Sequence, residues 1–213
     1  MLEFRLTPNH AGLALWGDFD TLHRLHEFIH RIVEESSMIS DKEGFVLSLA
    51  FDVRKAYSGQ RSEEYRGDGE NERYRIYGVE ILWPWLIAQV GILRQAMAFV
   101  PNNKLDQAVM FELEYHLETA IRQVMPGKAD EVIQWISRIG GNPYQQTDSV
   151  LDSRCRYFIG LPPKERLSAL PKLLETFDTM YTIISSSNVP FRPGVIHPDV
   201  FIDDETDWPD FEW

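Results

Sequence analysis

The chain has 213 residues, of which 44% are hydrophobic, 25% charged and 12% aromatic. This composition is typical of a compact globular protein and excludes a collagen-like chain, a disulfide scaffold and a wholly disordered polymer. Acids outnumber bases by 33 to 21, which gives a formal net charge of −12. Such a chain repels the phosphate backbone, so nucleic-acid binding is not expected.

The cysteine content and the hydropathy pattern both predict a cytoplasmic protein without a membrane segment. The single cysteine, Cys155, has no partner for an internal disulfide, which fits a reducing compartment. The chain does not open with a basic and then apolar leader, and the most apolar stretch, Ile81 to Val90, is far too short to span a bilayer.

The first 83 residues are predicted to form a mostly antiparallel sheet covered on one face by a helix, in the order strand, strand, helix, strand, strand. Alternating apolar residues predict strands at 2–7 and 13–16, and an apolar stripe at helical spacing predicts a helix over 19–36. Phe45, Leu47, Leu49, Phe51 and Val53 alternate with Ser48, Asp52 and Arg54, which predicts a strand over 44–54.

The segment between Tyr57 and Arg73 has no aliphatic residue and is predicted to be a long exposed loop. Strand character resumes over 73–83, with a change of phase at Gly78 that a bulge would produce.

The second half of the chain is predicted to be helical. Pro84 is well placed to open a buried helix that runs to about Val100. Further apolar stripes predict helices over 103–125 and around 132–139, and another helical run from Pro162 to about Ile183, while 142–161 stays ambiguous.

These elements predict an α+β fold in which a sheet-and-helix unit (1–83) packs on a helical unit (84–187). The junction from Ile81 to Trp85 is too apolar for a linker, so residues 1–187 are expected to form a single domain. Residues 188–213 form an appended tail rich in acids, prolines and aromatic residues.

One short motif suggests catalysis. His26-Glu27-Phe28-Ile29-His30 matches H-E-x-x-H and lies in a predicted helix, where residues i and i+4 share a face. Two imidazoles so placed can hold zinc while the glutamate takes a proton from the bound water. The resemblance to zinc metallopeptidases covers only these five residues, and Arg24 and Arg31 occupy flanking positions where those families are usually uncharged. The alternative is a solvated edge of a structural helix.

The tail suggests recognition. Phe201, Trp208, Phe211 and Trp213 stand among acids, whereas a purely solvating tail would rarely keep such large apolar groups. They can dock on the chain's own helical half, on a second copy, or on another protein.

We therefore expect a non-catalytic interaction or regulatory protein that binds a protein partner or itself, needs no cofactor and uses Phe201, Trp208, Phe211 and Trp213 as protein-binding residues. The alternative is a zinc-dependent hydrolase with His26 and His30 as metal ligands and Glu27 as the catalytic base.

Overall fold

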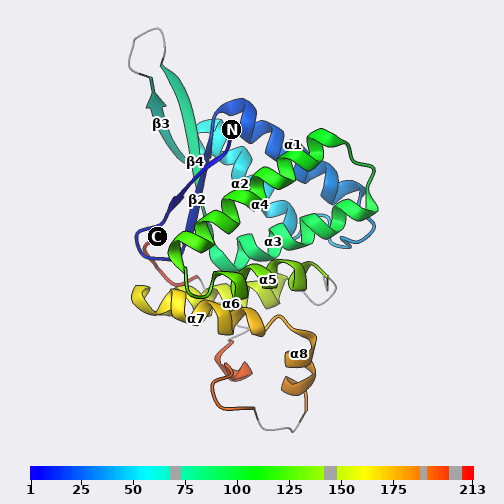
Figure 1. The fold of residues 1–213 in the computed structure, drawn as a ribbon, viewed down its shortest axis with the longest axis vertical. Helices are drawn as coiled ribbons and strands as arrows, with labels where there is room; N and C mark the ends of the chain where they lie inside the picture. Colours follow the sequence, from blue (N-terminus) through cyan, green and yellow to red (C-terminus); the bar gives the residue numbers. More distant parts are fainter. Residues whose placement is uncertain (68–72, 142–147, 188–190, 202–207) are drawn as a thin grey trace.

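A computed structural model describes residues 1–67, 73–141, 148–187, 191–201 and 208–213, and it confirms the α+β class with an N-terminal antiparallel sheet (Figure 1). The strand order is β1-β2-β4-β3, and every neighbouring pair is antiparallel. The strands are β1 (Glu3–Leu6), β2 (Gly12–Gly17), β3 (Ser62–Arg66) and β4 (Tyr74–Leu82).

Helices make up most of the rest of the described chain. They are α1 (Phe19–Glu35), α2 (Phe45–Lys55), α3 (Trp83–Ala96), α4 (Lys104–Val124), α5 (Ala129–Gly140), α6 (Asp148–Gly160), α7 (Pro163–Glu175) and α8 (Thr179–Ser185). Short turns of other helix types are η1 (Ala56–Gln60), η2 (Met97–Phe99) and η4 (Pro198–Val200). Within the described ranges, no helix combines the length and apolarity that crossing a bilayer demands.

The hydrophobic core is built around α3, which is buried almost all round, as its sequence predicts. Helix α5 crosses it at a close approach between Gly91 and Gly140. A Cβ on Gly91 would lie 2.2 Å from the Ile136 carbonyl oxygen, and one on Gly140 would lie 2.2 Å from the Gly91 carbonyl oxygen. Glycine at both positions lets the two backbones touch.

The strand predicted over 44–54 is wrong, because these residues form α2. The alternation of Phe45, Leu47 and Leu49 ignores Val46 and Ala50, which are also buried, and it places Phe51 in the core although that ring is 36% exposed. A local pattern also misses a long-range cap, because the Asp148 carboxylate accepts a hydrogen bond from the Phe45 amide at 3.0 Å.

The predicted loop between Tyr57 and Arg73 is only partly a loop. Its first residues complete η1, and Ser62–Arg66 form β3, the fourth strand of the sheet. Residues 68–72 lie outside the described residues. The β3–β4 hairpin projects from one end of the molecule, and α8 lies at the other (Figure 1).

The remaining predictions for the second half hold with changes at the boundaries. The ambiguous segment 142–161 contains α6, while its residues 142–147 lie outside the described residues. The single run predicted from Pro162 to Ile183 is two helices, α7 and α8, and Pro171 lies inside α7.

The outer face of the sheet carries a small apolar cluster of its own, centred on Trp16. The indole lies over Gly78, where a Cβ would come within 2.3 Å of the ring, and the Arg5 guanidinium lies 4.1 Å from the indole centroid. Two ion pairs join β1 to β3 across this face: Arg5 with Glu64 at 2.5 Å, and Arg66 with Glu3 in a bidentate contact.

Candidate functional site

The H-E-x-x-H residues lie on α1, as predicted, beside Tyr57 of η1. His23 and His30 are exposed, while the His26 side chain is only 12% exposed. The His26 ring lies 6.0 Å from that of His30 and 5.9 Å from that of Tyr57, measured between centroids. The α1 edge therefore carries neighbouring imidazoles, of which His23 and His26 pack on Tyr57, His23 at 5.6 Å between centroids.

Both polar contacts of His26 are made by the same ring nitrogen. Nδ1 lies 3.1 Å from a Glu27 carboxylate oxygen and 3.3 Å from the Tyr57 hydroxyl. Burial lowers the pKa of His26 below its ordinary value of 6.5, although the Glu27 carboxylate opposes this shift. Glu27 thus contacts His26, which the zinc hypothesis assigns as a metal ligand. This is not the arrangement expected of a catalytic base, which would contact the metal-bound water.

The zinc hypothesis also needs a third protein ligand. Among the described residues, no group of three or more His, Cys, Asp or Glu side chains is arranged to hold a metal ion. His26 and His30 thus lie side by side, as their spacing predicts, but the described part of the chain adds no further ligand to them.

The tail residues of the described chain pack on the chain itself. Phe201 lies edge to face with Tyr157 of α6, at 5.6 Å between centroids, and the Arg154 guanidinium is 4.1 Å from its ring. Residues 202–207 lie outside the described residues. We name residues 208–213, where the description resumes, the C-terminal segment.

A buried arginine anchors the C-terminal segment. Arg166 of α7 is 3% exposed, and its guanidinium donates to four backbone carbonyls, those of Asn9, Ile159, Leu161 and Glu212, at 2.9 to 3.2 Å. Burial lowers the pKa of this guanidinium. The Asn9 amide in turn donates to the Trp213 carbonyl at 3.0 Å. The segment is therefore held through its backbone carbonyls, by the Arg166 side chain of α7 and by the Asn9 amide of the β1–β2 turn, beside which the chain ends in Figure 1.

Held in this way, the C-terminal segment forms one wall of a cavity of about 340 Å³, which we name the aromatic recess. Trp208 meets Trp85 of α3 edge to face, at 5.8 Å between centroids. Phe211 and Trp213 contact each other at 5.0 Å. The described residues that line it are Asp52, Arg61, Glu80, Ile81, Leu82, Trp85, Trp208, Phe211 and Trp213.

The charged groups of the recess come from the sheet, α2 and the residue after η1. Asp52 of α2 is paired with Arg61 at 3.0 Å. Glu80 of β4 contacts the Ser62 hydroxyl at 3.5 Å. Because β4 continues directly into α3, Glu80 and Trp85 are held on two rigid elements joined by Leu82 and Trp83.

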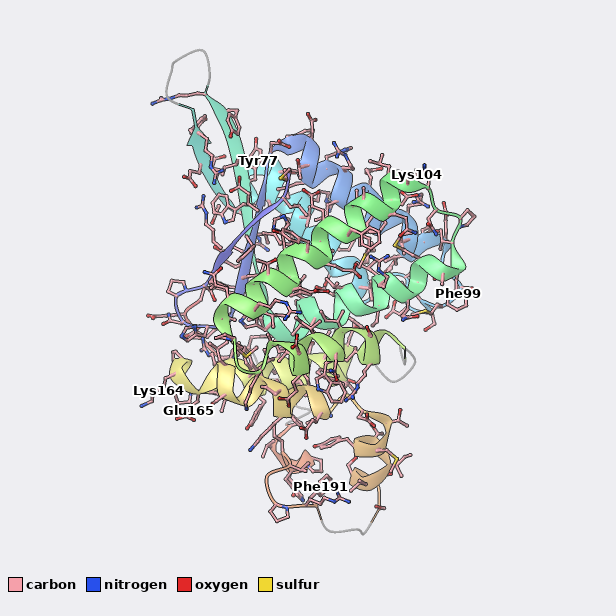
Figure 2. All side chains as sticks on the ribbon, viewed as in Figure 1. Tyr77, Phe99, Lys104, Lys164, Glu165 and Phe191 are labelled. Carbon is pink, nitrogen blue, oxygen red and sulfur yellow. The ribbon has the colours of Figure 1, made fainter. Side chains whose placement is uncertain are left out.

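A larger cleft of about 680 Å³ lies between α5 and the α8 region. Its aromatic groups are already engaged: Arg138 lies 4.9 Å from the Trp135 ring, and the Tyr181 hydroxyl donates to the Ile196 carbonyl. Phe191, which is labelled in Figure 2, packs on Tyr181 and His197. Its lining mixes acids with Arg138 and Arg192, so it presents no single charge to a ligand.

The sequence predicts Phe201, Trp208, Phe211 and Trp213 as protein-binding residues, and that role stays a prediction. The structure brings the last three together in the recess, while Phe201 packs on Tyr157 and is not among the described lining residues. The sequence pattern does not point to Trp85, Glu80 and Arg166 as site residues, because it assigns them to a buried helix, a strand and a helical run. The only available signal was the excess of tryptophan near Pro84 and in the tail.

Comparison with known proteins places the chain in a family but not with a characterised relative. A family model described as Domain of unknown function (DUF6904) matches residues 2–213. No curated protein matches the chain, and no solved structure does.

Proposed function

The chain belongs to this family over almost its whole length, and from the geometry of the site we propose that it is a non-catalytic binding protein that recognises its ligand in the aromatic recess. The observation that carries the proposal is the convergence of Trp85, Trp208, Phe211 and Trp213 around one cavity. Concave sites with aromatic walls and a few polar groups are typical of small-molecule recognition.

The lining favours binding over catalysis. Its described residues include no His, Cys, Ser, Thr or Lys that could act as a nucleophile. Its two carboxylates do not form a free acid–base pair, because Asp52 is already held by Arg61.

The test is a panel of small cationic, neutral and anionic compounds, titrated while the indole N–H signals of the tryptophans are followed by NMR. We expect at least one compound to shift the signals of Trp85, Trp208 and Trp213 in a saturable way. The signals of Trp16 and Trp135, which lie outside the recess, should not move. A panel in which no compound shifts the recess signals contradicts the proposal.

A matched pair of variants locates the binding. Phe211→Ala removes part of the recess wall and should weaken binding about tenfold or more. Phe111→Ala removes a ring of the same size from α4, where it is 60% exposed and is not part of the lining, and should leave binding unchanged. Equal effects of the two variants would also contradict the proposal.

The expected protein partner or self-association remains a prediction alongside this site. Trp208 is 36% exposed, so part of its side chain is accessible to a partner. Sedimentation of the full chain over a range of concentrations tests self-association directly.

The zinc-hydrolase alternative has less support, because Glu27 contacts His26 and no third ligand joins His26 and His30 in the described chain. It predicts near-stoichiometric zinc in protein purified without an affinity tag, lost in His26→Ala and His30→Ala. Metal-free protein whose melting is unchanged by a chelator would exclude it.

A further inference from the structure

The charges of the aromatic recess are not balanced. Among the described residues, two carboxylates, Asp52 and Glu80, and one guanidinium, Arg61, line it. The Asp52 and Arg61 charges neutralise each other in an ion pair. Among the described lining residues Glu80 therefore carries the unpaired charge, and a ligand beside it has to be compatible with a negative charge.

The Glu80 carboxylate has no cationic partner among the described residues, since no Lys, Arg or His nitrogen there lies within 4.0 Å of it. Its polar contact is the Ser62 hydroxyl at 3.5 Å, and the residue is half-buried. Other carboxylates of the sheet, such as Glu3 and Glu64, are each paired with an arginine. Glu80 is thus a carboxylate beside aromatic rings with room for a cation.

The aromatic rings around Glu80 also favour a positively charged ligand. The face of an aromatic ring carries negative electrostatic potential, and tryptophan attracts cations most strongly. Trp208 already shows this preference, because the Arg156 guanidinium lies 5.7 Å from its ring centroid. The rings of the recess therefore favour a cation over an anion, which Glu80 also repels, and two of them already have a guanidinium nearby, Arg156 at Trp208 and Arg166 at 6.0 Å from the Phe211 centroid.

The size and apolarity of the walls narrow the class of cation further. A volume of about 340 Å³ is near the lower end for ligand sites, which range over about 300–1,000 Å³. A primary ammonium is strongly hydrated and gives up its water only for several hydrogen-bond acceptors; of the two carboxylates in the described lining, Asp52 is already paired with Arg61, which leaves Glu80. A methylated ammonium is weakly hydrated and can exchange water for ring faces at little cost.

We propose that the aromatic recess binds a small organic cation bearing a methylated ammonium group, with the tryptophan rings around the methyl groups and the Glu80 carboxylate beside the charge. This assignment deepens the proposed function and rests on it. It concerns a free small molecule and not a methylated side chain of a protein partner.

The test compares choline with 3,3-dimethylbutan-1-ol, its neutral isostere in which carbon replaces nitrogen, and with tetramethylammonium. Binding to the full chain is followed by the indole N–H signals of Trp85 and Trp208. We expect choline and tetramethylammonium to bind in the recess, and the neutral isostere to bind at least about tenfold more weakly. A trimethyllysine peptide is included as a further arm.

Two Glu→Gln variants, which change the side chain in the same way, separate the role of Glu80 from a general effect of losing a negative charge. Glu80→Gln keeps the shape of the recess, and it should weaken choline about tenfold while leaving the neutral isostere unaffected. Glu63→Gln removes a carboxylate of β3 that is paired with Arg75 and does not line the recess, and it should leave both affinities unchanged. If Glu80→Gln does not fold, the comparison of choline with its isostere in the unaltered chain still decides the question.

Three results would overturn the inference. The first is a neutral isostere that binds as tightly as choline, and the second is choline affinity that is unchanged in Glu80→Gln; in both cases the recess remains a binding site and only the ligand class is wrong. The third is a trimethyllysine peptide that binds while choline and tetramethylammonium do not. Absence of any binding in the recess, from the whole panel, overturns the proposed function together with this inference.

Discussion

The guanidinium of Arg166, on α7, donates to the backbone carbonyl of Glu212 at 3.2 Å, and so fixes the C-terminal segment from the protein interior. The same guanidinium donates to Asn9 and to two carbonyls at the end of α6. One buried side chain therefore links the β1–β2 turn, α6 and the C-terminal segment. A point charge such as lysine cannot reproduce this fork of donors.

Replacement of Arg166 should lower the free energy of unfolding. Arg166→Gln leaves several buried carbonyls without a donor, so we expect the free energy of unfolding in urea to fall by about 2–4 kcal/mol. The matched control is Arg122→Gln, because Arg122 makes an ion pair with Asp130 in which both side chains are more than half exposed. The control should change stability by less than about 0.5 kcal/mol. Equal losses in the two variants would show that Arg166 is not a structural anchor.

A second prediction concerns Gly78 under the Trp16 ring. A Cβ at this position would come within 2.3 Å of the indole, so the ring has to move away from the sheet. We expect Gly78→Ala to lower the free energy of unfolding by about 1–3 kcal/mol, as overpacking does elsewhere. Gly127→Ala is the control, since nothing lies within 4 Å of the position that its Cβ would take. Unchanged stability of Gly78→Ala in a denaturant titration would contradict the described packing.

The sequence predicts best where one physical signal dominates. Helix α1 has a continuous apolar stripe and an aspartate, Asp18, that caps its first turn at 2.7 Å from the Thr21 amide. Helix α3 has Pro84 in its first turn and apolar residues around its whole circumference. In these elements the local pattern and the tertiary burial agree, so periodicity alone locates them.

Prediction from the sequence fails where residues far apart in the chain determine the local structure. The run from Phe45 to Lys55 fits a strand by alternation and a helix by spacing, and the choice follows from burial of Val46 and from the cap by Asp148, more than 100 positions away. The aromatic recess is assembled in the same way, from α2, β4, α3 and the C-terminal segment. Sequence can name Trp208 and Trp213 as unusual, but only the fold shows that they line one cavity with Trp85 and Glu80.

A third prediction concerns pH and the ion pair that closes the outer face of the sheet. The hydrogen bonds from Arg66 hold the pKa of Glu3 below its ordinary value of 4.5. Because the pKa is lower in the folded state, the pair stabilises the fold fully above about pH 4.5, and this stabilisation is lost as the pH falls through the folded-state pKa. We therefore expect Glu3→Gln to be less stable than the unaltered chain at pH 7.

The difference between the two proteins should shrink as the pH falls below 4.5 and through the folded-state pKa, because Glu3 becomes protonated and then resembles glutamine. Urea titrations at about pH 7, 5 and 3 measure this directly. A stability difference that stays constant over the three pH values would mean that the loss in Glu3→Gln comes from packing and not from the charge of Glu3.

The last prediction concerns Cys155, which stands between two arginines in the sequence. Flanking guanidinium groups can lower the pKa of an exposed thiol and make it reactive. In the structure Cys155 is 0% exposed, and burial raises its pKa well above the ordinary value of 9.0, so the arginines do not activate it. We expect the native thiol to resist an aromatic disulfide reagent at about pH 8 and to react only in the time that the protein takes to unfold. In urea above the unfolding midpoint the reaction should be as fast as that of a free thiol. Rapid labelling of the native chain, at a rate that urea does not change, would show that the thiol is accessible without unfolding.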